Sequence, residues 1–230
     1  RQVYDMAAYP KTLSGKTVAD YVNTHTDLSD ELYREGKLVS DNYKNILRSQ
    51  TNAAAIPADV TVRYGVTVRR ANLRNLPTGE GLFFYASDRN FDALQETALD
   101  PGEAVAILHT STNGYFYYVQ AYNYRGWLSK FDVAETDRST WLRYAEPKNF
   151  LTVVAKDYTL KADGAQVLFQ QGARLQLADK KASAYTVKVP VRTKEGKLQE
   201  EKVVLAANAS LHEGYLPYTT NNICLLYTSP

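Results

Sequence analysis

From residue 60 onwards, apolar side chains recur at every second position, and turn-forming residues interrupt them at short intervals. The clearest case is the segment 63–78, in which Val66 and Val68 flank Thr67. Alternation with a period of two places successive side chains on opposite faces of a strand, so that one face can be buried. This part of the chain is therefore predicted to be mainly β.

The rest of this region completes a small closed sheet. An apolar run at 104–109 is followed by Asn113-Gly114, a strong hairpin signal, and then by the aromatic run at 115–118. The sequence Tyr-Arg-Gly-Trp at 124–127 reads as a further short strand. Five short strands, one long early loop at 86–98 and short later turns describe an SH3-like barrel, which we assign to residues 59–135.

A second β series predicts another barrel of the same class over residues 148–210. Its strands are expected at 151–156, 166–169, 183–191 and 200–206. Residues 1–58 are expected instead to form a helical segment that packs on the part of the chain after it. In that segment, helices are predicted at 17–22 and 41–48, and acidic residues at 27–31 suggest another helix start. One helical turn is expected at 91–96, within the long loop.

Composition excludes several classes of function. The net charge of +2 is too small to argue for nucleic acid as a partner, and no apolar run approaches the length of a transmembrane helix. One cysteine and three histidines argue against a disulfide framework, a cysteine-only metal site and a histidine-based metal cluster. No cofactor is predicted. The 18 tyrosines favour half-buried pleated surfaces and permit a binding face. We expect a monomer.

No complete catalytic constellation is present, so no catalytic residue is assigned. Cys224 is the only thiol, and a histidine nearby in sequence, His212, does not make a catalytic dyad. Glu96, beside Gln95 in the early loop, could bind the ammonium group of a ligand, although most loop glutamates are solvated acids or helix caps. The arginines of 63–74 are expected on a solvent-facing strand surface, with one or two paired to acids of residues 1–58. A half-buried imidazole is expected for His109.

The aromatic residues leave two alternatives open. Every second aromatic side chain along a strand must face the core. The side chains between them are exposed unless a neighbouring domain or a ligand covers them. The candidates for such a binding face include Tyr117, Tyr118 and Trp127.

Several stretches together resemble one known family. They are Val-Arg-Arg-Ala-Asn-Leu-Arg at 68–74, Phe-Asp-Ala-Leu-Gln-Glu-Thr-Ala-Leu at 91–99, Pro-Gly-Glu at 101–103, Leu-His-Thr-Ser at 108–111 and Tyr-Arg-Gly-Trp at 124–127. They are similar to the first bacterial SH3 domain of the multidomain NlpC-type cell-wall cysteine peptidases. Such proteins carry an N-terminal stabilising segment, two bacterial SH3 domains and a papain-like catalytic domain. The resemblance implies that residues 1–58 are the stabilising segment and 148–210 the second barrel.

The resemblance also implies a function. Enzymes of this family cleave murein peptides next to γ-D-glutamyl residues, and their first barrel helps to recognise the free amino end of the peptide. This makes Glu96, Tyr117, Tyr118 and Trp127 candidate substrate contacts, with the choice between the two tyrosines open. It also implies a location in the cell envelope, periplasmic or secreted. The alternatives are a stand-alone protein that binds peptidoglycan or peptides and an adaptor for proline-rich segments.

The C-terminal residues depart from the family pattern. Residues 211–223 resemble the lead-in to the catalytic domain, but Cys224 lacks the Asp-Cys-Ser-Gly context of the family's nucleophile. Residues 224–230 resemble translated sequencing-adapter read-through. We therefore expect a fragment whose partner, the catalytic domain of the same chain, is missing.

Overall fold

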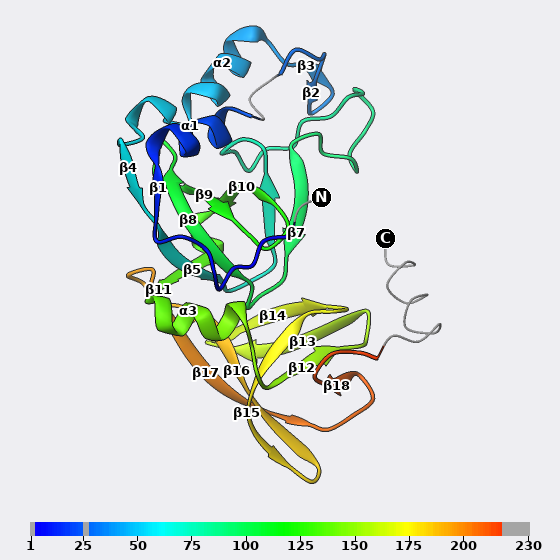
Figure 1. The fold of residues 1–230 in the computed structure, drawn as a ribbon. Helices are drawn as coiled ribbons and strands as arrows, with labels where there is room; N and C mark the ends of the chain where they lie inside the picture. Colours follow the sequence, from blue (N-terminus) through cyan, green and yellow to red (C-terminus); the bar gives the residue numbers. More distant parts are fainter. Residues whose placement is uncertain (1–2, 25–27, 218–230) are drawn as a thin grey trace. The chain divides into compact units, whose positions relative to one another are not determined.

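The computed structural model describes residues 3–24 and 28–217 of the chain (Figure 1). These residues divide into two compact units that are interleaved along the sequence. The first unit comprises Arg1–Tyr64, Ala71–Leu99 and Val105–Phe131, and the second comprises Gly65–Arg70, Asp100–Ala104 and Asp132–Pro230. Residues 132–135 of the barrel expected at 59–135 thus group with the second unit, as do two short segments of it, 65–70 and 100–104. These two segments hold each other there, because the Thr67 hydroxyl donates to the Asp100 carbonyl at 2.6 Å.

Two helices of the first unit form where the sequence predicts them. They are α1 (Gly15–Asn23) and α2 (Asp41–Ser49), and a 3-10 turn, η1 (Ala53–Ala55), comes after them. Each helix begins at a serine whose hydroxyl accepts a backbone N–H three residues later: Ser14 from Thr17 at 3.1 Å and Ser40 from Tyr43 at 3.3 Å. Such caps satisfy a backbone donor that the first helical turn leaves unpaired.

The helix expected to start at 27–31 is wrong for its described residues, 28–31, which have no helical structure. The chain runs instead into a hairpin of β2 (Tyr33–Arg34) and β3 (Lys37–Leu38). Glu35 and Gly36, with φ of 52° and 81°, make a tight turn that favours extended flanks over a helix. The helical turn expected at 91–96 is also wrong, because β7 (Gln95–Leu99) begins there.

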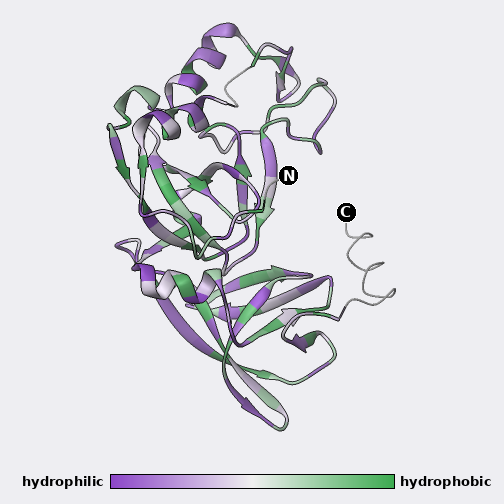
Figure 2. Cartoon of the chain, viewed as in Figure 1, coloured by the Kyte–Doolittle hydropathy of each residue, from purple (hydrophilic) through white to green (hydrophobic). Residues whose placement is uncertain are grey.

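The largest sheet has seven strands in the order β11-β5-β8-β9-β10-β6-β7, and β1 (Thr12–Ser14) pairs separately with β4 (Asp59–Thr61). Besides β7, its strands are β5 (Arg63–Thr67), β6 (Ala71–Arg74), β8 (Ala104–Thr110), β9 (Phe116–Gln120), β10 (Arg125–Ser129) and β11 (Val133–Thr136). Figure 2 shows that β8 consists largely of hydrophobic residues. One of them, Ile107, is fully buried. The mainly β fold class is therefore confirmed.

Two details of this sheet can be compared with the prediction from the sequence. The hairpin predicted at Asn113-Gly114 joins β8 to β9, and Gly114 adopts a positive φ of 70°. The segment 63–78 forms two strands, β5 and β6, rather than one. A Cβ at Gly126 of β10 would lie 2.6 Å from the Arg74 carbonyl of β6, so this close approach requires glycine.

The second unit contains a five-stranded sheet in the order β17-β16-β15-β12-β18 and a separate hairpin, β13-β14. The strands are β12 (Phe150–Val153), β13 (Asp157–Ala162), β14 (Ala165–Gln170), β15 (Arg174–Lys181), β16 (Ala184–Arg192), β17 (Leu198–Ala206) and β18 (Leu211–Glu213). Both sheets contribute to one core, which includes Phe169 and Leu175. Four of these strands match the predicted ones, whereas β13, β15 and β18 were not expected.

The helix α3 (Arg138–Ala145) of the second unit was not predicted either; the 3-10 turn η2 (Lys130–Asp132) precedes it in the chain. The local signal was Asp137, whose Oδ1 accepts the backbone N–H of Thr140 at 2.9 Å. Hydrogen bonds from Ser139 and Thr140 hold the pKa of the Asp137 carboxyl well below its usual range. The carboxylate is therefore the form that stabilises the helix.

Replacing Asp137 with alanine is expected to lower the free energy of unfolding by about 1 kcal/mol, the usual cost of losing such a cap. Because the pKa is lowered in the folded state, the carboxylate stabilises the fold above its unfolded pKa and loses this effect as the pH falls. The difference between the variant and the parent should therefore shrink below about pH 4. Urea unfolding at pH 7 and pH 3 measures it; a difference that grows on acidification would contradict the assignment.

Candidate functional site

The arginines of 63–74 are mostly engaged within the fold. Arg69 and Arg70 lie 3.4 Å from Asp132 and Asp100, and Arg74 lies 2.6 Å from Asp92. None of these acids belongs to residues 1–58, so the expected pairing with that segment is wrong for these three arginines. Arg74 is also buried rather than solvent-facing, with a side chain that is 6% exposed. These three ion pairs therefore stabilise the fold, and the candidate site must involve other residues.

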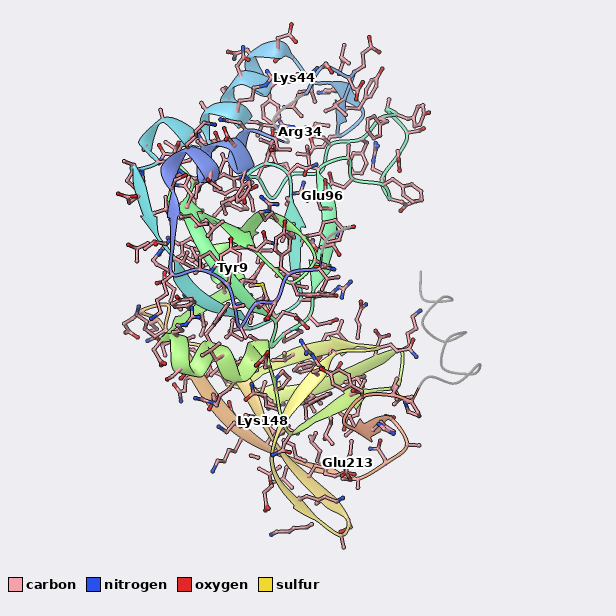
Figure 3. The ribbon with its side chains drawn as sticks, viewed as in Figure 1. Tyr9, Arg34, Lys44, Glu96, Lys148 and Glu213 are labelled. Carbon is pink, nitrogen blue, oxygen red and sulfur yellow. The ribbon has the colours of Figure 1, made fainter. Side chains whose placement is uncertain are left out.

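A pocket of about 380 Å³ in the first unit brings two of the predicted site residues together. Its lining residues come from the N-terminal segment, from α1 and its C-terminal end, and from β7, β9 and the turn into β10: Tyr4, Tyr21, Thr24, Glu96, Tyr118, Asn123, Tyr124 and Arg125. Glu96, labelled in Figure 3, lies on β7 and not in the loop where it was expected. Glu96 and Tyr118 thus both line one pocket.

The two adjacent tyrosines of β9 have different environments because successive side chains of a strand point to opposite faces. Tyr118 lines the pocket, and its hydroxyl donates to the Tyr21 carbonyl at 2.8 Å. Burial raises the pKa of the Tyr118 hydroxyl, which therefore stays protonated as a donor. The ring of Tyr117 faces Arg63 instead, with the guanidinium 4.9 Å from the ring centroid. Of the two tyrosines that the sequence left open, Tyr118 is therefore the one that lines the pocket.

Trp127 does not fit its predicted role as a direct ligand contact, because its side chain has no exposed surface. Its ring meets that of Tyr118 edge to face, with the centroids 5.2 Å apart. It also lies 6.3 Å from the ring of His109. Trp127 therefore supports the pocket wall through Tyr118.

Arg125 is the cation of the pocket, and aromatic rings hold it in place. Its guanidinium lies 3.6 Å from the centroid of the Tyr21 ring and donates to the Tyr4 hydroxyl at 2.7 Å. Beside it, the buried Oδ1 of Asn123 has no hydrogen-bond partner among the described residues. The Glu96 carboxylate and the tyrosine rings suit the ammonium group of a ligand, while Arg125 suits a carbonyl or carboxylate.

Tyr4, Tyr21 and Thr24 line the pocket, although the sequence does not single them out. They belong to the segment before the barrel, and no local pattern marks them as site residues, since they meet the barrel strands only through the tertiary fold. The only hint was the excess of tyrosine.

The other predicted candidates lie outside the pocket. His109 is half-buried, as expected, with Nε2 3.0 Å from the Asn52 carbonyl oxygen. Burial lowers the pKa of His109 more than its backbone hydrogen bonds raise it, so the imidazole is neutral at physiological pH. Cys224 and the segment 218–230 lie outside the described residues.

Comparison with protein families matches residues 82–129 to the SH3 domain of the SH3b1 type. These residues form a bacterial SH3 domain. The SH3 domain supplies five of the lining residues, Glu96, Tyr118, Asn123, Tyr124 and Arg125, and the preceding segment supplies the other three. The matched range also lies within the barrel predicted at 59–135.

The whole fold is similar to that of an NlpC/P60 endopeptidase from Photobacterium damselae subsp. piscicida. The TM-score is 0.63 at 21% sequence identity, and the match covers 87% of this chain and 44% of that chain. The SH3-like fold and the resemblance to this class of peptidase are confirmed. A comparison with curated proteins found no match. Across the described ranges, no helix combines the length and the apolar content needed to cross a membrane.

Proposed function

We propose that this chain is the substrate-positioning region of a bacterial cell-wall cysteine peptidase that hydrolyses murein peptides next to γ-D-glutamyl residues. The observation that carries the proposal is the meeting of Glu96 and Tyr118 in one pocket of the SH3 domain. The fold similarity to an NlpC/P60 endopeptidase supports the same reading. The described residues hold the peptide, and the reaction is assigned to a catalytic domain of the full-length protein.

In this proposal the pocket binds the free amino end of the stem peptide. The Glu96 carboxylate accepts hydrogen bonds from the ammonium group. Tyr118 forms an apolar wall that excludes water, which strengthens the attraction between the two charges. Arg125 lies at the same pocket and can receive the first carbonyl group of the peptide.

The proposal also assigns a role to the other parts of the chain. Residues 1–58 are the stabilising segment, 59–135 the first barrel and 148–210 the second, with 211–223 leading towards the catalytic domain. Because the substrate is part of the cell wall, we propose a periplasmic or secreted location in the cell envelope. The protein acts as a monomer without a cofactor.

Replacing Glu96 with glutamine is expected to weaken binding of an L-Ala-γ-D-Glu-containing tripeptide about tenfold, because a charge-assisted hydrogen bond becomes a neutral one. Acetylating the amino group of the peptide should weaken binding by a similar factor. The two changes remove the same contact, so together they should cost little more than either alone. Isothermal titration calorimetry of the four combinations measures this coupling.

The matched control is Glu31→Gln, which removes an exposed carboxylate outside the pocket and should leave binding unchanged. Fully additive effects of Glu96→Gln and acetylation would show that Glu96 does not touch the amine and would refute the assignment. Tight binding to intact peptidoglycan that ignores both changes would favour the stand-alone wall-binding protein instead.

A further inference from the structure

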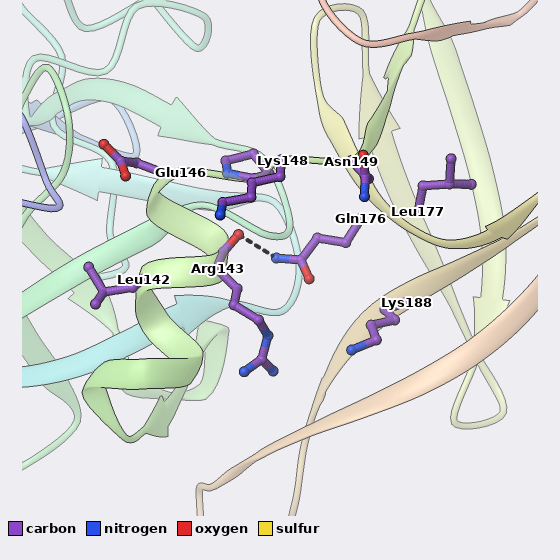
Figure 4. Close-up of a pocket in the computed structure, with 9 residues that line it drawn as sticks. Leu142, Arg143, Glu146, Lys148, Asn149, Gln176, Leu177 and Lys188 are labelled. Carbon is purple, nitrogen blue, oxygen red and sulfur yellow. Dashed lines mark hydrogen bonds between the residues drawn. The ribbon is translucent and has the colours of Figure 1, made fainter.

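The second unit has a cavity of its own, of about 350 Å³, between the end of α3 and the five-stranded sheet (Figure 4). Its lining residues come from α3, the connection to β12, β15 and β16: Leu142, Arg143, Glu146, Pro147, Lys148, Asn149, Gln176, Leu177 and Lys188. This volume is near the lower end of the range for small-molecule sites.

Positive charge predominates in the cavity. Three cations line it, Arg143, Lys148 and Lys188, against one lining carboxylate, Glu146. A second carboxylate, Glu200, lies 3.3 Å from Arg143 and 2.8 Å from Lys188. Three cations against two carboxylates leave one positive charge uncompensated. Lys148 has no ion-pair partner in the described part of the chain, so its ammonium group is available to a ligand.

The end of α3 does not oppose an anion as strongly as a bare helix C-terminus would. The Leu142 carbonyl accepts the backbone N–H of Glu146 at 2.9 Å. The Arg143 carbonyl accepts a hydrogen bond from Nε2 of Gln176 at 3.0 Å, the bond drawn in Figure 4. These two carbonyls near the end of α3 therefore already have donors.

Part of the cavity wall is apolar. Leu142, Pro147 and Leu177 contribute hydrocarbon surface beside the cationic groups. An inorganic anion would leave this surface unused, whereas a ligand with a carboxylate and a short aliphatic part would contact both.

We propose that this cavity binds a small organic carboxylate with an adjoining apolar group, such as the carboxyl-terminal residue of a short peptide. Lys148 receives the carboxylate, and Leu142 and Leu177 contact the aliphatic part. This inference concerns a second site and does not rest on the function proposed for the SH3 domain.

The test titrates the full chain with three probes: N-acetyl-Ala-Ala, its carboxyl-terminal amide and inorganic phosphate. Backbone amide chemical shifts report where each binds. The acid should shift the amides of Gln176 and Leu177 with a dissociation constant of about 1 mM, the range of weak small-ligand sites. Binding should weaken as salt is raised from about 0.01 to 0.15 M. The amide should bind at least about fivefold more weakly, because it lacks the charge.

Replacing Lys148 with glutamine should weaken binding of the acid about three- to fivefold, the usual effect of one partly exposed charge. Lys148 is exposed, so the variant should unfold at the parent's urea concentration. Lys194→Gln, which removes an exposed charge outside the cavity, is the control and should bind like the parent. Equal binding of acid and amide, equal binding of phosphate, no shift at all, or an unchanged Lys148→Gln variant would each overturn the proposal.

Discussion

Replacing Asp92 with alanine is expected to lower the free energy of unfolding by about 3–5 kcal/mol, because it leaves the buried Arg74 guanidinium without its counter-charge. Arg74 Nη1 donates to Asp92 Oδ2 at 2.6 Å, and the two side chains are 6% and 16% exposed. Asp92 Oδ1 also accepts the backbone N–H groups of Leu82 and Leu94, at 3.1 and 3.0 Å. One carboxylate therefore satisfies three donors around the long loop of the SH3 domain.

Two further variants separate the charge from the backbone contacts. Asp92→Asn keeps an oxygen for the two amides, so it should cost less than alanine. Removing the cation as well, in Arg74→Met with Asp92→Asn, should recover part of the loss because no buried charge remains unpaired.

The control is an exposed ion pair. Lys16 and Asp20, with side chains 85% and 63% exposed, lie 2.8 Å apart on α1, and Asp20→Asn should cost no more than about 0.5 kcal/mol. Urea unfolding of the four variants and the parent measures these differences. A loss for Asp92→Ala as small as that for Asp20→Asn would show that the buried pair does not stabilise the fold.

Replacing Trp127 with alanine is expected to cost about 3–5 kcal/mol, the range for deleting a buried aromatic side chain. Trp127 has no exposed surface and meets the Tyr118 ring at 5.2 Å. The loss should therefore extend from stability to the pocket, since Tyr118 loses the ring that holds it in place. Thermal unfolding measures the first effect, and tripeptide titration at a temperature where the variant is folded measures the second.

The matched variant is Trp127→Phe. The indole Nε1 has no hydrogen-bond partner among the described residues, so phenylalanine forfeits no hydrogen bond there. Phenylalanine leaves a smaller cavity than alanine, so Trp127→Phe should cost less than Trp127→Ala. A phenylalanine variant as unstable as the alanine variant would indicate that the indole N–H is in fact paired.

Short-range features of the structure could be predicted because local chemistry determines them. The hairpin at Asn113-Gly114 results from the positive φ that glycine adopts at no steric cost. The helix α2 results from its serine cap and from the spacing of its apolar residues. The helix wrongly expected at 27–31 carried acidic residues that also suit an exposed loop, so the local signal was ambiguous. Asp137 is a typical N-cap residue, so α3 was also predictable from its local sequence.

By itself, the sequence determined the mainly β architecture and the SH3-like domain, since period-two alternation, turn residues and family motifs are all encoded locally. It also gave Glu96, Tyr117, Tyr118 and Trp127 as candidate contacts, with the choice between the two tyrosines open. Only the tertiary structure decided that Tyr118 rather than Tyr117 lines the pocket with Glu96, that Trp127 supports it through the Tyr118 ring, and that residues of the N-terminal segment complete it. The physical reason is that the pocket unites side chains from α1, β7, β9 and β10, elements far apart in the chain. No local pattern specifies which of their faces meet.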